Sequence, residues 1–115
     1  MSLQAYRSAS QRVESPRELE YRLFSEVTRS MIEAEALDAA AVGPRMEALD
    51  WNRRVWATLA GACAEDGNGL ADATRANIIS LSLWVDRHSD AVFRREETFQ
   101  PLIEVNRLVM QGLAA

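Results

Sequence analysis

The residues of this 115-residue chain that could do chemistry are few, and their spacing does not complete a catalytic or metal site. His88 is the single histidine, and Asp86 and Asp90 lie two residues to either side of it, a spacing that turns their side chains away on a helix. No second histidine or paired cysteine can complete a zinc site. We therefore expect His88 to be exposed or at the edge of the core, and we expect no metal or cofactor.

Two further patterns are weaker still as chemical sites. The segment Asp66-Gly67-Asn68-Gly69 is similar to the start of a calcium loop, but Leu70 stands where an oxygen ligand is needed and Asn77 where a bidentate glutamate is needed. A turn is the simpler prediction, because glycine and asparagine tolerate positive φ. Cys63 falls on an apolar helix face, where unreactive cysteines usually lie. A spatial pairing with His88 stays open, but an enzyme would need at least two convergent titratable groups in a cleft, so this class is the least favoured.

Charge and composition narrow the classes of partner. The net charge is −4, and the thirteen basic residues, all arginines, are interleaved with seventeen acidic ones. This balance disfavours binding to DNA and to anionic membranes, both of which require clustered positive charge. The longest nearly apolar run, Ile78 to Val85, is far shorter than the ~20 residues of a membrane span. With one cysteine and no signal-like N-terminus, we expect a cytoplasmic protein.

Helical periodicity and helix-start residues predict an all-α protein, a small bundle of four to five helices. We expect a partly mobile or helical N-terminal arm over residues 1–14 and a single helical domain over residues 15–115. Within that domain the expected helices cover residues 16–36, 44–64, 72–92 and 101–111. The expected start and stop signals are the Ser15 cap with Pro16 behind it, Gly43-Pro44, the Asp72 cap, Pro101 and the terminating Gly112.

Three asparagines do not fit a plain apolar core. Asn52 lies within the apolar arc of its helix, Asn106 near the centre of the apolar face of the last helix, and Asn77 close in angle to Trp84 and His88. A buried amide costs free energy unless it is hydrogen-bonded. We expect these amides to bond to loop backbones, including the turn at Asn68, and so to fix the helix packing, with direct contact to a partner as the alternative.

The three tryptophans are predicted to differ in role. Trp56 and Trp84 fall on apolar faces and are expected in the core. Trp51 lies at the edge of an apolar arc and is the candidate for exposure, and exposed tryptophans are common anchors of protein interfaces.

The order and spacing of several short motifs resemble the FlaF family of alphaproteobacterial flagellar regulators, from about Tyr6 to Leu113. One departure is Ala71, where proline would be expected after the Asn-x-Leu turn. The motifs are Ser15-Pro16-Arg17-Glu18-Leu19-Glu20, Val27-Thr28, Asn52 with Trp56, Asn68-x-Leu70, Ile79-Ser80-Leu81 with Val85, Leu102-Ile103-x-x-Asn106-Arg107 and Gly112-Leu113.

The resemblance implies a flagellin-binding export chaperone that couples flagellin secretion to flagellin synthesis, with an FlbT-type regulator of flagellin message as a further partner. An amphipathic flagellin helix would bind in a groove along the first long helix or the arm before it. The competing interpretation of the helix-face candidates is that they belong to the core. Alternatives are direct action on flagellin mRNA and an oligomeric scaffold, with self-association left open. The partner-binding candidates are Leu23, Phe24, Val27, Met31 and Trp51.

Overall fold

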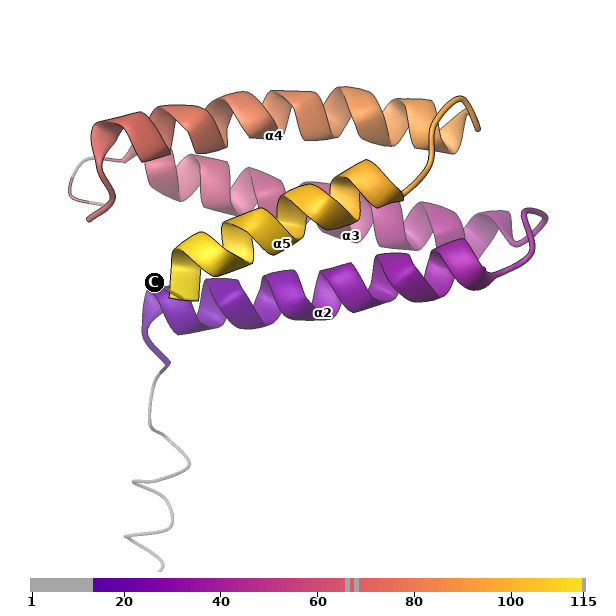
Figure 1. The fold of residues 1–115 in the computed structure, drawn as a ribbon, viewed down its shortest axis with the longest axis horizontal. Coiled ribbons are helices and arrows are strands. Elements are labelled where there is room, and N and C mark those ends of the chain that lie inside the picture. Colours follow the sequence, from indigo (N-terminus) through magenta and orange to yellow (C-terminus); the bar gives the residue numbers. More distant parts are fainter. Residues whose placement is uncertain (1–13, 66, 68, 115) are drawn as a thin grey trace, which may run out of the picture.

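The computed structural model describes residues 14–65, 67 and 69–114, and over these residues the chain forms four helices and no strand (Figure 1). The helices are α2 (Pro16–Ala36), α3 (Val42–Ala64), α4 (Asp72–Phe93) and α5 (Gln100–Ala114). The prediction of a small all-α bundle is confirmed. Of the predicted N-terminal arm, residues 1–13 lie outside the described residues.

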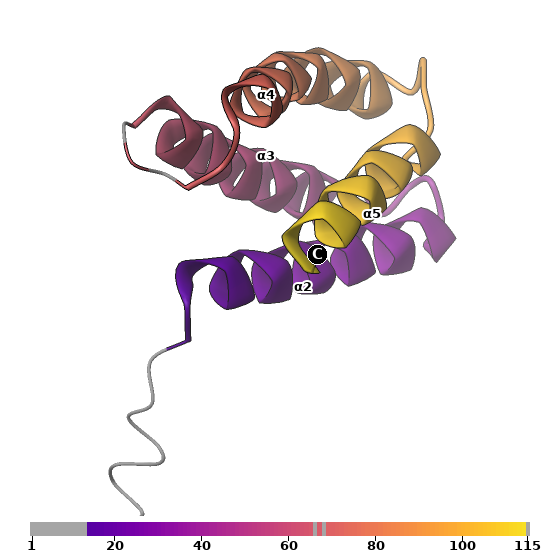
Figure 2. The same cartoon turned by 60° about the vertical axis from the view of Figure 1, so that its left-hand side comes forward.

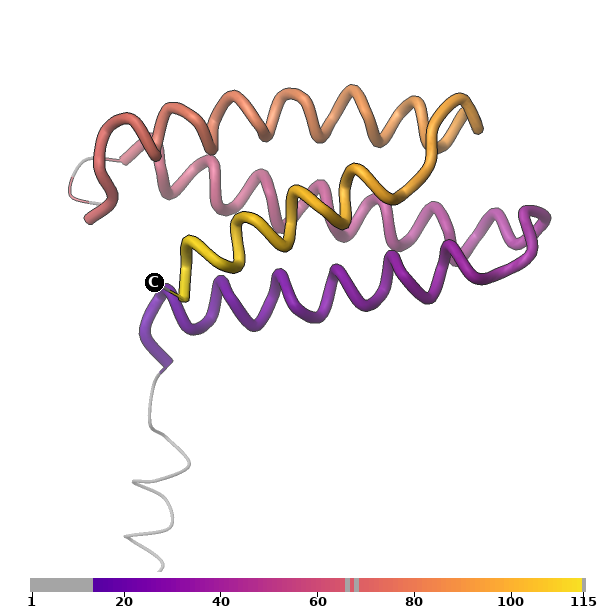
Figure 3. Tube along the Cα trace, viewed as in Figure 1, coloured from indigo at the N-terminus to yellow at the C-terminus, as the bar shows by residue number. Residues whose placement is uncertain are grey.

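Each of the first three helices runs antiparallel to the one before it, so that α2 and α4 point the same way, and α3 packs between them. The trace in Figure 3 shows this up-and-down path and the return of the chain through α5. The last helix packs mainly on α2 and has few contacts with α4. Figures 1 and 2 together place α5 over one face of the α2–α3–α4 layer. No described element covers the other face of that layer.

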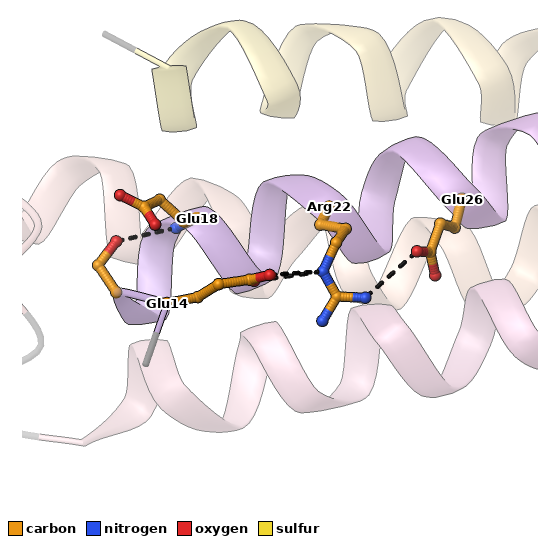
Figure 4. Close-up of polar contacts among 5 residues, drawn as sticks. Glu14, Glu18, Arg22 and Glu26 are labelled. Atoms are coloured by element: carbon orange, nitrogen blue, oxygen red, sulfur yellow. Dashed lines mark hydrogen bonds and ion pairs between the residues drawn. The ribbon is translucent and has the colours of Figure 1, made fainter. Parts of the chain in front are cut away.

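The start of α2 follows the local sequence. The hydroxyl of Ser15 accepts a hydrogen bond from the backbone N–H of Glu18 at 3.1 Å, and Pro16 occupies the first helical position, as predicted. Just before the helix, the Glu14 carboxylate accepts from Nε of Arg22 at 3.0 Å, and Arg22 also pairs with Glu26 at 3.2 Å (Figure 4). These contacts draw the residue that precedes α2 toward its second turn.

Three predicted helix boundaries need correction. Helix α3 begins at Val42, two residues before the predicted start at Pro44, so that proline lies in the first turn, where its missing N–H costs nothing. Ala71 is the N-cap residue of α4, and Asp72 is the first helical residue rather than its cap. Gly112 does not end α5, which continues to Ala114.

The α3–α4 turn is held from the α4 side. Gly67 and Gly69 adopt φ of 79° and 89°, a conformation that glycine enters without a steric penalty, while Asn68 lies outside the described residues. The guanidinium of Arg75 donates to the carbonyl oxygens of Cys63 at 2.6 Å and Glu65 at 2.9 Å. It therefore satisfies carbonyls at the C-terminus of α3 that have no partner within the helix.

The core draws on all four helices and on the α4–α5 connection. Its centre is an edge-to-face pair between Phe24 and Trp56, whose ring centroids are 5.4 Å apart. Leu113 is buried against this core, which explains why α5 runs through Gly112: packing of the last turn outweighs the low helix propensity of glycine. The other large buried side chains are Val27, Met31, Leu59, Val85, Val92, Phe99, Leu102 and Ile103.

Candidate functional site

Three of the five predicted partner-binding residues belong to the core. Phe24, Val27 and Met31 have side chains that are 0% exposed. A stripe of apolar residues on a helix indicates that this face is covered, either by other helices of the same chain or by a partner. Here α3 and α5 cover it. The prediction that these three residues form a binding surface is therefore corrected: in this structure they stabilise the bundle.

The other two candidates, Leu23 and Trp51, lie together in a groove between α2 and α3. Both are half-buried and pack against the core from its edge. The groove has a volume of ≈ 630 Å³ at Leu23 and Trp51 and continues into a hollow of ≈ 300 Å³ toward the far end of α2. We call this surface the α2–α3 groove; its lining is Leu23, Ser30, Glu33, Ala34, Leu37, Pro44, Glu47, Trp51, Arg54, Val55 and Thr58.

The groove lies on the side of α2 turned away from α5. Leu23 and Ser30 are seven residues apart, so they share one face of α2, and Leu37 directly follows the helix at the far end of the groove. At 100° per residue, Thr28, which Asn106 of α5 contacts, points more than a third of a turn away from that face. The groove is therefore on the face of the helical layer that α5 leaves uncovered.

The charge of the groove is acidic. Arg54 is paired with Asp50, with Nε 3.3 Å from the carboxylate, so its charge is locally balanced. Among the described residues, no ion pair joins Glu33 or Glu47 to a basic side chain. An occupant with positive charge would find two free carboxylates on the walls of the groove.

A buried polar network joins three helices on the opposite side of the α2–α3 contact. The indole N–H of Trp56 donates to Oδ1 of Asn106 at 2.8 Å. The Asn106 amide nitrogen then donates to Oδ1 of Asn52 at 2.8 Å and to the hydroxyl of Thr28 at 3.1 Å. Asn52 and Asn106 are 0% exposed, and the amide nitrogen of Asn52 has no partner.

This network corrects the predicted partners of the buried asparagines. Asn52 and Asn106 bond to each other and to side chains of α2 and α3, not to loop backbones, because α5 crosses the layer where Thr28 and Asn52 face it. The predicted role, fixing the helix packing, fits this geometry. Asn77, in contrast, is exposed on α4.

The aromatic and histidine residues of α4 lie near its surface. Trp84, expected in the core, is half-buried and stacks on His88 with ring centroids 4.8 Å apart. His88 lies at the edge of the core, with Nε2 3.0 Å from the carbonyl oxygen of Thr98. This pair connects α4 to the segment before α5, and within the described part of the chain neither ring forms a hydrogen bond or ion pair with a titratable side chain.

A second hollow, which the sequence analysis did not predict, lies between α3 and α4. It has a volume of ≈ 540 Å³, with the exposed side chains of Met46 and Phe93 at its walls. Arg53 crosses it, donating to the carbonyl oxygen of Asp86 at 2.7 Å and forming an ion pair with Asp90. The hydrogen bond from Arg53 holds the pKa of Asp90 below its ordinary value. Asp50, Arg53 and Asp90 are ion-paired here, and Glu47, which also lines the α2–α3 groove, is the one charged side chain of this lining without an ion-pair partner among the described residues. This hollow is therefore a weaker candidate than the α2–α3 groove.

No cluster of three His, Cys, Asp or Glu side chains within the described ranges is placed to hold a metal ion. None of the four described helices combines the length and apolarity needed to cross a bilayer.

The sequence was compared with protein-family models, with curated proteins and with solved structures. The sequence matches the family model described as flagellar protein FlaF over residues 2–113. No match was found among curated proteins or among solved structures. The matched range includes the α2–α3 groove, the buried network and nearly all of the segment that precedes α2.

Proposed function

The chain belongs to the FlaF family of flagellar proteins, and from this premise we propose that it binds unassembled flagellin as an export chaperone and so couples flagellin secretion to flagellin synthesis. The binding site in this proposal is the α2–α3 groove, and the bound element is an amphipathic helix from one end of flagellin. An FlbT-type regulator of flagellin message is proposed as a further partner. The activity is binding rather than catalysis.

One observation carries this proposal: two apolar anchors, Leu23 and Trp51, lie half-buried in an open groove on the uncovered face of the layer. Grooves of this kind take the apolar face of an amphipathic helix, whose contacts recur every three or four residues. From Leu23 to the end of α2 at Ala36 the groove follows the helix for thirteen residues, which corresponds to about 20 Å or nearly four turns of a bound helix. A tryptophan in such a position is a typical energetic centre of an interface.

The acidic walls of the groove favour a protein helix over RNA. Glu33 and Glu47 would repel a phosphate backbone, which requires clustered positive charge. The alternative in which this protein acts on flagellin mRNA by itself therefore lacks a surface in the described structure that supports it, whereas action through a second regulator is compatible with the groove.

The test is co-elution on a sizing column with the flagellin of the same organism, both full-length and lacking each terminal segment. Two variants probe the groove: Trp51→Ala and Leu23→Ala. The matched control is Leu83→Ala on α4, because Leu83 is an exposed leucine remote from the groove, 58% exposed. Circular dichroism confirms that each variant remains folded.

We expect a complex that is lost with one flagellin terminal segment and that Trp51→Ala weakens by at least about 30-fold in Kd, the effect of removing an interface anchor worth about 2 kcal/mol. Leu83→Ala should bind like the parent protein. Absence of a complex with every flagellin version would refute flagellin binding. Equal binding by all three variants would instead refute the groove as its site.

A further inference from the structure

We infer that the hollow between α3 and α4 is a second binding site, which takes an apolar side chain together with a neutral amide group beside it. The occupant is a segment of a partner protein, because a peptide chain presents an amide next to every side chain. The site is separate from Leu23 and Trp51 of the α2–α3 groove, so the inference does not rest on flagellin binding and can be tested without flagellin.

Two hydrogen-bond donors without partners are the first support. Ser89 lines the hollow and is 1% exposed, yet its hydroxyl forms no hydrogen bond within the described structure. Nε of Arg53, also in the lining, is buried and lacks a hydrogen bond as well, since the Asp86 carboxylate lies 3.9 Å away. Buried polar groups are nearly always paired, so these two donors indicate that an acceptor enters the hollow from outside.

The apolar walls are the second support. Met46 and Phe93 are 49% and 54% exposed, although both are large apolar side chains. Phe93 lies one turn after Ser89 on α4, and Met46 lies seven residues before Arg53 on α3, so each helix brings one apolar and one polar side chain to the hollow. Its volume of ≈ 540 Å³ is within the range of pockets that hold small organic groups, and an apolar occupant would cover both walls.

The charge of the lining selects the kind of acceptor. Glu47, Asp50 and Asp90 line the hollow, and Arg53 is the one basic residue there and is already paired with Asp90. A carboxylate or phosphate would therefore be repelled, whereas a neutral carbonyl oxygen would not. An amide also carries N–H groups, which the carboxylate of Glu47 can accept. An amide thus complements both the free donors and the acidic lining.

The hollow opens on the same face of the helical layer as the α2–α3 groove. Glu47 lines both of them. Asp50, in the lining of the hollow, is two residues from Asn52, which corresponds to about 200° around α3, and Asn52 bonds to Asn106 of α5. A segment bound in the hollow therefore lies on the face that α5 leaves uncovered, with α3 as the ridge between the two sites.

The experiment is an NMR titration of the full-length, ¹⁵N-labelled protein with 3-phenylpropanamide, which joins an apolar ring to a neutral amide. The matched ligand is 3-phenylpropanoate, which has nearly the same shape but a negative charge. The signals to follow are the side-chain Nε–H of Arg53 and the backbone amides of Ser89 and Phe93. The test variant is Ser89→Ala, and the control is Ser82→Ala, which removes a half-buried serine of α4 outside the lining of the hollow.

We expect the amide to shift these signals saturably, with a Kd on the order of a few millimolar for a ligand of this size. Loss of one hydrogen bond in Ser89→Ala should weaken binding about five-fold, while Ser82→Ala should bind like the parent. The carboxylate should bind more weakly than the amide to the parent. Without ligand, Ser89→Ala should unfold at a temperature equal to or above that of the parent, because it removes a buried hydroxyl without a partner.

Three results would overturn the inference. The first is the absence of a saturable shift at Arg53 and Ser89 up to the solubility limit of the amide, including the case in which the amide shifts only signals of the α2–α3 groove. The second is binding of the carboxylate as tightly as the amide, or equal binding of the amide by the parent and Ser89→Ala. The third is a lower unfolding temperature for Ser89→Ala, which would show that the hydroxyl is already paired within the free protein.

Discussion

Replacing Asn106 by alanine should be among the most destabilising single changes in this protein. Its amide makes three side-chain hydrogen bonds, to Trp56, Asn52 and Thr28, at 2.8, 2.8 and 3.1 Å. Removing it leaves the buried indole N–H of Trp56 without an acceptor and the buried amide of Asn52 without any partner. Each orphaned buried group costs about 1–3 kcal/mol, so we expect a total loss of about 3–5 kcal/mol in the free energy of unfolding.

This loss is large compared with the whole stability of a domain of this size, which is about 6–17 kcal/mol at ordinary values per residue. With a urea dependence of about 2 kcal/mol per molar, the unfolding midpoint should fall by about 2 M. With an unfolding entropy of about 2.1 cal/mol/K per residue, Tm should fall by roughly 15 °C.

The assay is urea unfolding followed by tryptophan fluorescence and, independently, by circular dichroism. The matched control is Asn77→Ala, because Asn77 is an asparagine within a helix but is exposed. That change should leave stability the same or raise it slightly, since alanine is the better helix former. A loss below about 1 kcal/mol for Asn106→Ala would refute the reasoning, because three buried hydrogen bonds cannot then hold α5 to the layer.

Three further changes test other parts of the structure. Asn52→Leu should cost clearly less than Asn106→Leu in urea unfolding, because Asn52 makes one side-chain hydrogen bond and its amide nitrogen is already unpaired; an equal or larger cost would contradict this. Asp90→Asn should lower Tm near pH 7, because Arg53 holds the pKa of Asp90 below its ordinary 3.8 and so the charged form stabilises the fold. The stabilisation by charged Asp90 is fully present above pH 3.8 and is lost as the pH falls through the lowered pKa. The difference in Tm between the parent and Asp90→Asn should therefore shrink in acid. A difference in Tm that stays constant with pH would count against the ion pair. Cys63 is fully buried and burial raises the pKa of its thiol, so a thiol reagent should react with it only as fast as the protein unfolds, and rapid reaction of the native protein would show that the site is open.

Local signals predicted the helices well where the ends are set by nearby residues. Ser15 and Pro16 mark the start of α2 because a cap and a first-turn proline act within one turn of chain. Gly112 failed as a stop signal because the burial of Leu113, which depends on α2 and the rest of the core, extends α5 past it. Helix ends decided by tertiary packing are beyond the reach of local sequence.

The candidate site was predicted only in outline for a related reason. The apolar stripe on α2 includes Leu23 and Phe24 alike, and periodicity cannot tell which of two neighbours a later helix will cover. In the structure, α3 and α5 bury Phe24, whereas Leu23 lines the α2–α3 groove. Similarly, the sequence singles out Asn52 and Asn106 as buried amides, but a pairing across 54 positions of the chain becomes visible only when α5 is in place.

The position of α4 has a consequence for how the molecule opens. This helix rests against α3 and has few contacts with α5, and only four of its residues are buried. The network that ties α2, α3 and α5 together includes none of its side chains. Detaching α4 therefore requires breaking its interface with α3, the most extensive helix pair of the bundle, but leaves the buried network intact, and we expect this to be the first sub-global opening. In hydrogen exchange, the amides of α4 should lose protection at a lower free energy than those of α3.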